Sequence, residues 1–153
     1  MLPRRSAGKV THKVNAACHC GNILVDLELA RAPSTYTPRA CDCNFCRKYG
    51  ASYVSDAQGS LLIRISDEHE CGKYRQGSGL ADFLLCRNCG VLVGVCHRSD
   101  GRLYAAVNAK AVDVRVNFRA EQPVSPKKLA ESEKWVRWHE ICVSNVSVVN
   151  VDA

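Results

Sequence analysis

Seven of the ten cysteines fall into three tight groups, and this clustering constrains the fold more than any other feature of the 153-residue chain. The groups are Cys18-His19-Cys20, Cys41-Asp42-Cys43-Asn44-Phe45-Cys46 and Cys86-Arg87-Asn88-Cys89-Gly90. Four thiolates close a tetrahedral zinc site, whereas three leave one coordination position open, as catalytic zinc sites do. The count therefore permits one closed site of four sulfurs and one open site of three.

Cysteine usage also bears on the compartment. The segment 1–14 is basic and lacks the apolar stretch and cleavage site of a secretory signal, so we expect a disordered arm there, followed by a single zinc-binding domain over 15–153. In a reducing compartment clustered cysteines hold metal more often than they form disulfides, which predicts a cytoplasmic protein. The alternative is a secreted disulfide scaffold, but a core of this size does not need such cross-links.

Charge and hydrophobicity exclude few partners. The formal net charge is +6, from 21 Lys+Arg against 15 Asp+Glu. Seven thiolates and two Zn²⁺ ions would lower it by about three charges, so the basic balance permits anionic ligands but does not indicate nucleic acid. No apolar run reaches the roughly 18 residues that cross a bilayer, which argues against a membrane role. Nothing in the sequence indicates an oligomeric state.

Hydrophobic periodicity predicts a mainly β domain with one minor helix. Ile23, Val25, Leu27 and Leu29 alternate with polar residues, as in a half-buried strand. Further strands are expected over 51–54, 61–65, 71–74, 83–85, 91–96, 103–107, 112–116 and 143–151. The helix is expected after Ser125-Pro126, which resembles an N-cap followed by proline at the first helical position.

The first and third cysteine groups each offer a pair of sulfurs. If the chain is extended at Cys18 and Cys20, both side chains point to one face and can reach one ion. Cys86-x-x-Cys89 followed by Gly90 is a zinc-knuckle pattern, in which the glycine permits the tight turn. If the pairs meet, they form a Cys₄ site that ties the start of the sheet to its middle and contributes folding free energy.

The second group, Cys41, Cys43 and Cys46, can wrap around a single ion within six residues. No fourth ligand is obvious nearby, so water or a substrate thiol would fill the remaining position. The alternative is a closed Cys₃His site completed by a distant histidine. Arg47 and Lys48 follow directly, and their charge would offset the thiolates and could hold a carboxylate of an incoming ligand.

Isolated cysteines and histidines receive structural assignments. Cys71, Cys96 and Cys142 stand alone, and we expect them to be small buried hydrophobic residues. His19 lies between two candidate ligands and is expected at the surface. His97 could relay a proton, but no motif selects it.

In order and spacing, the three cysteine motifs resemble the glutathione-dependent formaldehyde-activating enzyme family, which also includes centromere protein V. Val107-Asn108 resembles the strand that follows the knuckle in that family, and the resemblance covers roughly residues 15–116. The resemblance implies a zinc-containing β-tent fold. It further implies a structural zinc on Cys18, Cys20, Cys86 and Cys89, and a catalytic zinc on Cys41, Cys43 and Cys46. Asn44 departs from the serine of many members, and the resemblance identifies no counterpart for the N-terminal arm or for the segment after Ala120.

The resemblance also implies a function, namely a carbon–sulfur lyase with two zinc ions per chain that condenses formaldehyde with glutathione to S-hydroxymethylglutathione. A related thiol and aldehyde would serve the same chemistry, because the motifs do not identify the true substrates. Arg47 and Lys48 are the candidates for holding glutathione carboxylates. The alternative is a non-catalytic zinc module that carries glutathione or binds protein or nucleic acid.

Overall fold

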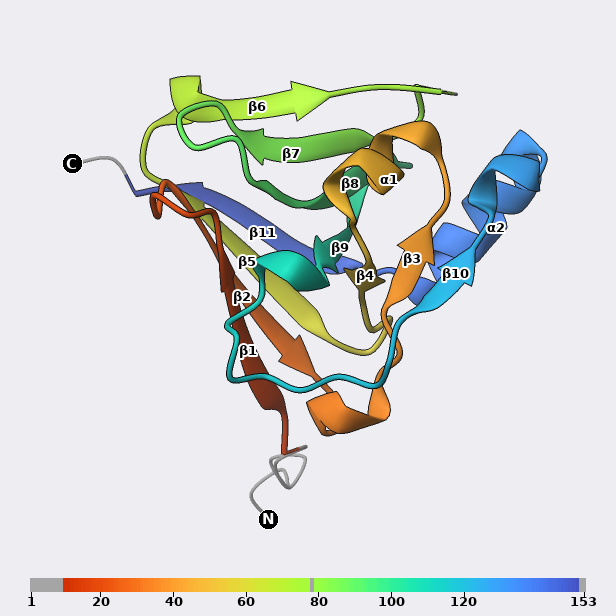
Figure 1. Ribbon diagram of the computed structural model, residues 1–153, viewed down its shortest axis with the longest axis horizontal. Coiled ribbons are helices and arrows are strands. Elements are labelled where there is room, and N and C mark those ends of the chain that lie inside the picture. Colours follow the sequence, from red (N-terminus) through yellow and green to blue (C-terminus); the bar gives the residue numbers. More distant parts are fainter. Residues whose placement is uncertain (1–9, 78, 152–153) are drawn as a thin grey trace, which may run out of the picture.

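A computed structural model describes residues 10–77 and 79–151, and the described chain folds mainly as two β-sheets (Figure 1). The first sheet has the strand order β1-β2-β5-β11, and the second has the order β10-β3-β4-β9-β8-β7-β6. Their bounds are β1 His12–Ala17, β2 Ile23–Leu29, β3 Arg39–Cys41, β4 Tyr53–Val54, β5 Ser60–Ile65, β6 Cys71–Tyr74, β7 Asp82–Cys86, β8 Leu92–Ser99, β9 Arg102–Asn108, β10 Gln122–Val124 and β11 Asn145–Asn150. The predicted mainly β class is confirmed.

The core lies where the two sheets face each other. Alternate residues of β2, from Ile23 to Leu29, are almost fully buried, as their periodicity predicts. They pair in antiparallel register with β5, whose Leu61, Ile63 and Ile65 are also buried. Full burial of such a side chain contributes about 1.5–3 kcal/mol, so this strand pair is a large part of the apolar core.

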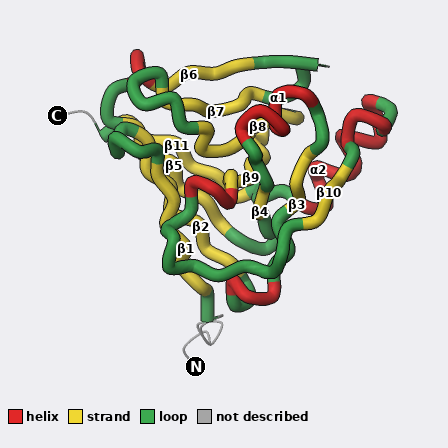
Figure 2. Tube along the Cα trace, in the orientation of Figure 1, coloured by secondary structure: helices red, strands yellow, loops and turns green. Residues whose placement is uncertain are grey.

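In the part of the chain that the structure describes, two α-helices accompany the sheets, α1 over Asn44–Tyr49 and α2 over Glu131–Ile141 (Figure 2). Short 3₁₀ turns cover Pro33–Thr35, Glu68–Glu70, Ala109–Ala111 and Pro126–Lys128. The predicted C-terminal helix begins later than expected, because Pro126 opens only a 3₁₀ turn and the backbone is extended again at Leu129. The backbone N–H of Ala130 donates to the Glu133 carboxylate at 3.1 Å, which starts α2 there.

The structure also corrects two predicted segments. Strand β1 begins at His12, so the end of the basic segment 1–14 is part of the first sheet; residues 1–9 lie outside the described residues. The alternating valines of 112–116 do not form a strand. Val112 makes an isolated bridge to Ala16, and the N–H of Val116 bonds the carbonyl of Asp113 at 2.9 Å in a turn that leaves Val114 95% exposed.

Parallel pairing places the C-terminal part of the chain against earlier segments. Strand β10 pairs with β3 and β11 pairs with β5, each in parallel register. Figure 1 shows β10 beside β3, with α2 following it at the edge of the molecule. The second cysteine group begins in β3, so the β10 pairing brings the C-terminal segment to that group. No helix in the described residues is long and apolar enough to cross a membrane.

Candidate metal centres and the adjoining pocket

The first and third cysteine groups meet in space, although they are far apart in sequence. The sulfurs of Cys18, Cys20, Cys86 and Cys89 all lie within 4.8 Å of one another. The Cys20 sulfur is 3.7 Å from that of Cys18 and 3.5 Å from that of Cys86. Zinc–sulfur bonds of about 2.3 Å in a tetrahedron place sulfurs about 3.8 Å apart, so this four-cysteine cluster fits one such ion.

Turns rather than a strand present these sulfurs. The chain leaves β1 at Ala17, and the Gly21 N–H bonds the Cys18 carbonyl at 3.2 Å. The segment Cys18–Cys20 is therefore not extended, although both sulfurs still reach one point, as the sequence permitted. The N–H of Ile23 also donates to the Cys18 sulfur at 3.3 Å. The second pair forms the predicted knuckle, in which Gly90 adopts a φ of +80° and bonds the Cys86 carbonyl at 2.7 Å.

The second group forms a compact trio. The sulfurs of Cys41, Cys43 and Cys46 lie within 4.8 Å of one another. Cys41 ends β3, and Cys43 caps the N-terminus of α1 by accepting the Cys46 N–H at 3.3 Å. All five histidines lie in the described part of the chain, and no histidine, aspartate or glutamate there joins the trio. The described residues thus supply three ligands and no Cys₃His site.

Two polar side chains contact the trio. The Tyr53 hydroxyl is 3.1 Å from the Cys46 sulfur, and the Gln76 amide donates to the Cys43 sulfur at 3.6 Å. Burial raises the pKa of Tyr53, and the charge of the neighbouring Cys46 acts in the same direction. Tyr53 therefore keeps its proton, and its hydroxyl shares a hydrogen bond with the Cys46 sulfur. Such contacts orient metal ligands and tune their charge.

The thiols of the trio ionise unequally. A hydrogen bond from Cys46 lowers the pKa of Cys41 to about 6, although burial opposes this shift. The same hydrogen bond, together with burial, raises the pKa of Cys46. The Cys41 sulfur is thus anionic near neutral pH, whereas the Cys46 sulfur keeps its proton. A divalent cation that binds the trio would displace this proton. The donor set suits a cation that prefers thiolates.

Asp42 lies between two trio cysteines but contacts the C-terminal segment instead. Its carboxylate accepts a hydrogen bond from the Ser125 hydroxyl and lies 3.9 Å from the Lys127 ammonium. These contacts continue the β10–β3 pairing and secure the 3₁₀ turn at Pro126–Lys128 beside the trio. The carboxylate is not a member of the cysteine cluster.

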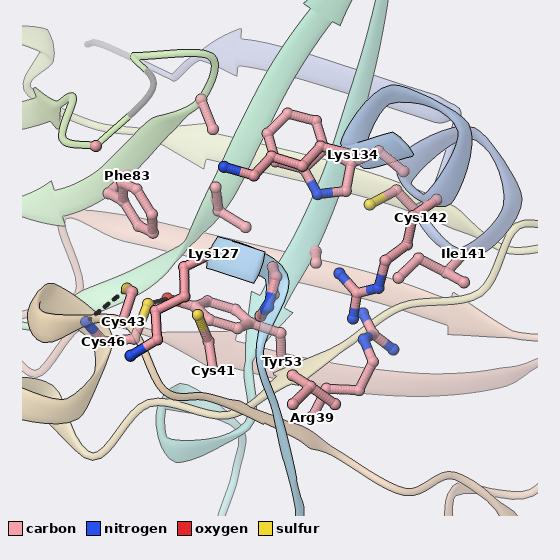
Figure 3. Close-up of a pocket in the computed structure, with 18 of the residues that line it drawn as sticks. Arg39, Cys41, Cys43, Cys46, Tyr53, Phe83, Lys127, Lys134, Ile141 and Cys142 are labelled. Atoms are coloured by element: carbon pink, nitrogen blue, oxygen red, sulfur yellow. Dashed lines mark hydrogen bonds between the residues drawn. The ribbon is translucent and has the colours of Figure 1, made fainter. Parts of the chain in front are cut away.

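The trio opens onto a pocket of about 160 Å³ (Figure 3). In this view the three sulfurs lie together on one side, with Arg39, Ile141 and Cys142 across from them. The wall is largely apolar and includes Phe83, Val95, Ala106, Val124, Pro126, Trp138 and Ile141. Its cationic residues are Arg39, Lys127, Lys134 and Arg137. The pocket therefore combines thiolates, an apolar wall and positive charge.

The two residues predicted to contact the substrate lie outside this pocket. Arg47 and Lys48 are exposed on α1 and do not line the pocket, so their contact with glutathione stays a prediction. Sequence analysis did not assign Arg39, Tyr53 or Arg137 to the site. Arg39 precedes Cys41 by two residues, and a predicted strand there would have placed both on one face. No comparable signal pointed to Tyr53 or Arg137.

The remaining cysteines are buried, as expected. Cys71, Cys96 and Cys142 are each at most 9% exposed, and Cys142 also lines the pocket. All ten cysteines lie within the described residues and are free thiols, so the disulfide-scaffold alternative is not formed. His19 is exposed, as predicted.

His97 lies on β8, is 5% exposed and packs against α2. Its Nδ1 lies 2.8 Å from the Leu80 carbonyl, and its ring centroid lies 4.2 Å from that of Trp135 and 4.4 Å from that of Trp138. Within the described chain, its buried Nε2 has no hydrogen-bond partner. His97 does not line the pocket, so its position favours a packing role over a proton relay.

Comparisons with known proteins agree with this arrangement. The family model for the glutathione-dependent formaldehyde-activating enzyme matches residues 13–128. A solved structure of a Rhodobacter sphaeroides protein is 28% identical with a TM-score of 0.52, covering 67% of this chain and 90% of its own. No curated protein sequence matches the chain. The matched span contains all seven clustered cysteines and ends before α2.

Proposed function

Because the chain belongs to the glutathione-dependent formaldehyde-activating enzyme family, we propose that it is a zinc-dependent carbon–sulfur lyase that condenses formaldehyde with glutathione. A related thiol or aldehyde would use the same site. The observation that carries this proposal is the position of the Cys41–Cys43–Cys46 trio, which faces a pocket and has no fourth ligand among the described residues. Free thiols also suit a reducing compartment such as the cytoplasm.

Zinc is the proposed metal at both clusters, because all-thiolate donor sets select zinc over harder cations. Cys18, Cys20, Cys86 and Cys89 would hold a structural ion, since their four sulfurs complete a tetrahedron. Cys41, Cys43 and Cys46 would hold the catalytic ion. The chain would then carry two zinc ions.

The reaction forms one carbon–sulfur bond. The thiol sulfur supplies the electron pair to the aldehyde carbon, and the thiol proton ends on the aldehyde oxygen. Zinc bound to the trio would favour the thiolate form of the thiol and would polarise the aldehyde. The Tyr53 hydroxyl contacts the Cys46 sulfur, the Gln76 amide donates to the Cys43 sulfur, and Phe83 and Trp138 belong to the apolar wall of the pocket. Arg47 and Lys48 remain candidates for a glutathione carboxylate outside the pocket.

The test is the exchange rate of the formaldehyde–glutathione adduct, measured by NMR with and without zinc-loaded protein. We expect acceleration that is lost in the Cys43→Ser variant. Cys71→Ala is the matched control, because it removes a buried thiol that belongs to neither cluster. An exchange rate unchanged by the zinc-loaded protein would contradict the proposal. It would favour the alternative zinc module that carries glutathione or binds protein or nucleic acid.

A further inference from the structure

Two arginines line the pocket from elements far apart in sequence, Arg39 in β3 and Arg137 in α2. Burial lowers the pKa of Arg39, and the nearby charge of Arg137 acts in the same direction. Arginine side chains are charged at physiological pH. Within the described residues, neither forms an ion pair with an acidic side chain. Two neighbouring cations thus share a partly enclosed space.

The orientation of Arg39 is held by a short hydrogen-bond chain. Its Nη2 donates to the Ser55 hydroxyl at 2.8 Å, and that hydroxyl donates to the Ile141 carbonyl at 2.5 Å. The chain joins β3 to the end of α2, which also carries Arg137. A guanidinium has further N–H donors, and those of Arg39 have no other partner in the described chain. They are therefore available to a ligand in the pocket that Arg39 lines.

An anionic ligand would neutralise the two unpaired cations. Like charges withdrawn from water disfavour each other and lose hydration, so an unpaired cation pair in a pocket calls for a counter-charge. Carboxylates match the planar guanidinium and accept paired N–H bonds from it. Lys134 lines the same pocket one helical turn before Arg137 and adds to the positive potential.

The arginines lie within reach of the trio. Arg39 and Cys41 are two residues apart on β3, so their side chains leave the same face from Cα atoms about 6.6 Å apart. Apolar side chains line the same pocket as the thiolates and the cations. A molecule that places its sulfur at the trio can therefore place an acidic group at the arginines.

We propose that Arg39 and Arg137 form a carboxylate subsite, which holds the acidic group of a thiol whose sulfur reaches Cys41, Cys43 and Cys46. This inference rests on the proposed function and narrows its substrate to carboxylate-bearing thiols. It also assigns a role to α2, which lies outside the matched family span. Neutral thiols would reach the trio without this anchor.

The test is calorimetric binding of S-methylglutathione to the zinc-loaded full-length protein. The methyl group blocks the thiol, so binding reports the subsite without requiring the reaction. We expect Arg137→Gln and Arg39→Gln each to weaken binding at least tenfold. Arg102→Gln is the matched control, because Arg102 is exposed on β9, away from the pocket. We expect it to bind as the wild type does.

A second ligand and a further variant make the test decisive. The diethyl ester of S-methylglutathione lacks the carboxylate charges, and we expect it to bind weakly and with no further loss in Arg137→Gln. Arg39→Lys keeps the positive charge but loses the planar guanidinium that forms paired hydrogen bonds with a carboxylate. Weaker binding in a folded Arg39→Lys protein would therefore report the lost hydrogen bonds and not misfolding. Equal binding of the acid and its ester, or wild-type affinity in both glutamine variants, would overturn the subsite.

The proposed function can fail separately. If the wild-type protein does not accelerate adduct exchange but binds S-methylglutathione through Arg39 and Arg137, the subsite stands and the catalytic proposal falls. If it accelerates exchange with glutathione and 2-mercaptoethanol equally, and the glutamine variants bind normally, only the subsite falls. Circular dichroism of every variant confirms that the fold is retained.

Discussion

The two cysteine clusters use the same donor atom in different settings. The four-cysteine cluster joins segments 66 residues apart, at Cys20 and Cys86, and turns of the backbone surround it. The trio lies within one short segment and lines a pocket. Under the proposed function, what a sulfur connects, and what it faces, decides whether it stabilises the fold or serves chemistry.

Chain topology gives this contrast an approximate magnitude. By the loop-closure relation for cross-links, closing a loop of about 66 residues removes about 4 kcal/mol of unfolded-state entropy. Closing the six-residue loop of the trio removes about 2 kcal/mol on the same relation. A metal ion at the first cluster should therefore stabilise the fold more than one at the second.

The largest expected effect comes from opening the four-cysteine cluster. Cys86 is fully buried, and Cys86→Ser removes a ligand between β7 and the knuckle. Structural zinc contributes about 10–16 kcal/mol in small domains, so the loss should approach the whole free energy of unfolding, about 5–15 kcal/mol. Urea denaturation followed by circular dichroism measures it. A cooperative transition at the wild-type midpoint would remove the structural role of this cluster.

Next comes the trio, where activity and stability should separate. Cys43→Ser should slow adduct exchange at least about 100-fold, because Cys43 is a proposed ligand of the metal that would act on the reactants. The free energy of unfolding should fall by less than about 2 kcal/mol, since the trio closes only a short loop. NMR exchange and urea denaturation on the same sample test both halves. Full activity, or unfolding as severe as in Cys86→Ser, would erase the contrast between the clusters.

A smaller effect is expected at the hydroxyl beside the trio. Tyr53→Phe removes the 3.1 Å contact to the Cys46 sulfur and should weaken zinc binding at the trio about tenfold. The free energy of unfolding should fall by about 1 kcal/mol. Competition with a chromophoric chelator measures the affinity, and Tyr49→Phe, at a side chain 41% exposed, is the control. Equal affinity in both variants would show that the hydroxyl does not tune the metal.

The smallest effect concerns pH and lies outside both clusters. Burial lowers the pKa of His97 below its usual 6.5, so the folded state binds this proton less readily than the unfolded state. Stability from neutral His97 is present above about pH 6.5 and is lost as pH falls through the folded pKa. Acid also releases metal from thiolates, but it does so in the wild type and in a His97→Gln variant alike. Their difference in unfolding free energy should therefore shrink between pH 7.5 and 5.5, and a constant difference would contradict this.

Sequence patterns predicted the features that depend on residues close together in the chain. Ligand spacing identified the three cysteine groups and permitted their division into four and three, which the family resemblance implied and the structure forms. The alternation in β2 identified its buried face. The helix α1 escaped notice because a thiol, Cys43, caps it in place of the usual serine, threonine, aspartate or asparagine. Strands β3 and β10 were not predicted, because they have only three residues each, too few to show a period of two.

The pocket could not be predicted for a related reason. Arg39 and Arg137 come together only because β10 returns to pair with β3 and α2 follows it. This pairing joins segments about 80 residues apart through backbone hydrogen bonds, which carry no sequence signature. The alternating valines at 112–116 show the converse, since a turn at Asp113 overrides their β pattern.

The parallel return of β10 onto β3 also has an evolutionary consequence. The cysteine trio lies in the part of the chain that the family model matches, whereas α2 lies beyond it. If α2 holds the carboxylate of the thiol as proposed, substitutions in α2 would alter which thiols a lineage accepts while the seven clustered cysteines stay in place. A protein divided in this way would acquire new substrates by drift in α2 without changing its proposed metal ligands.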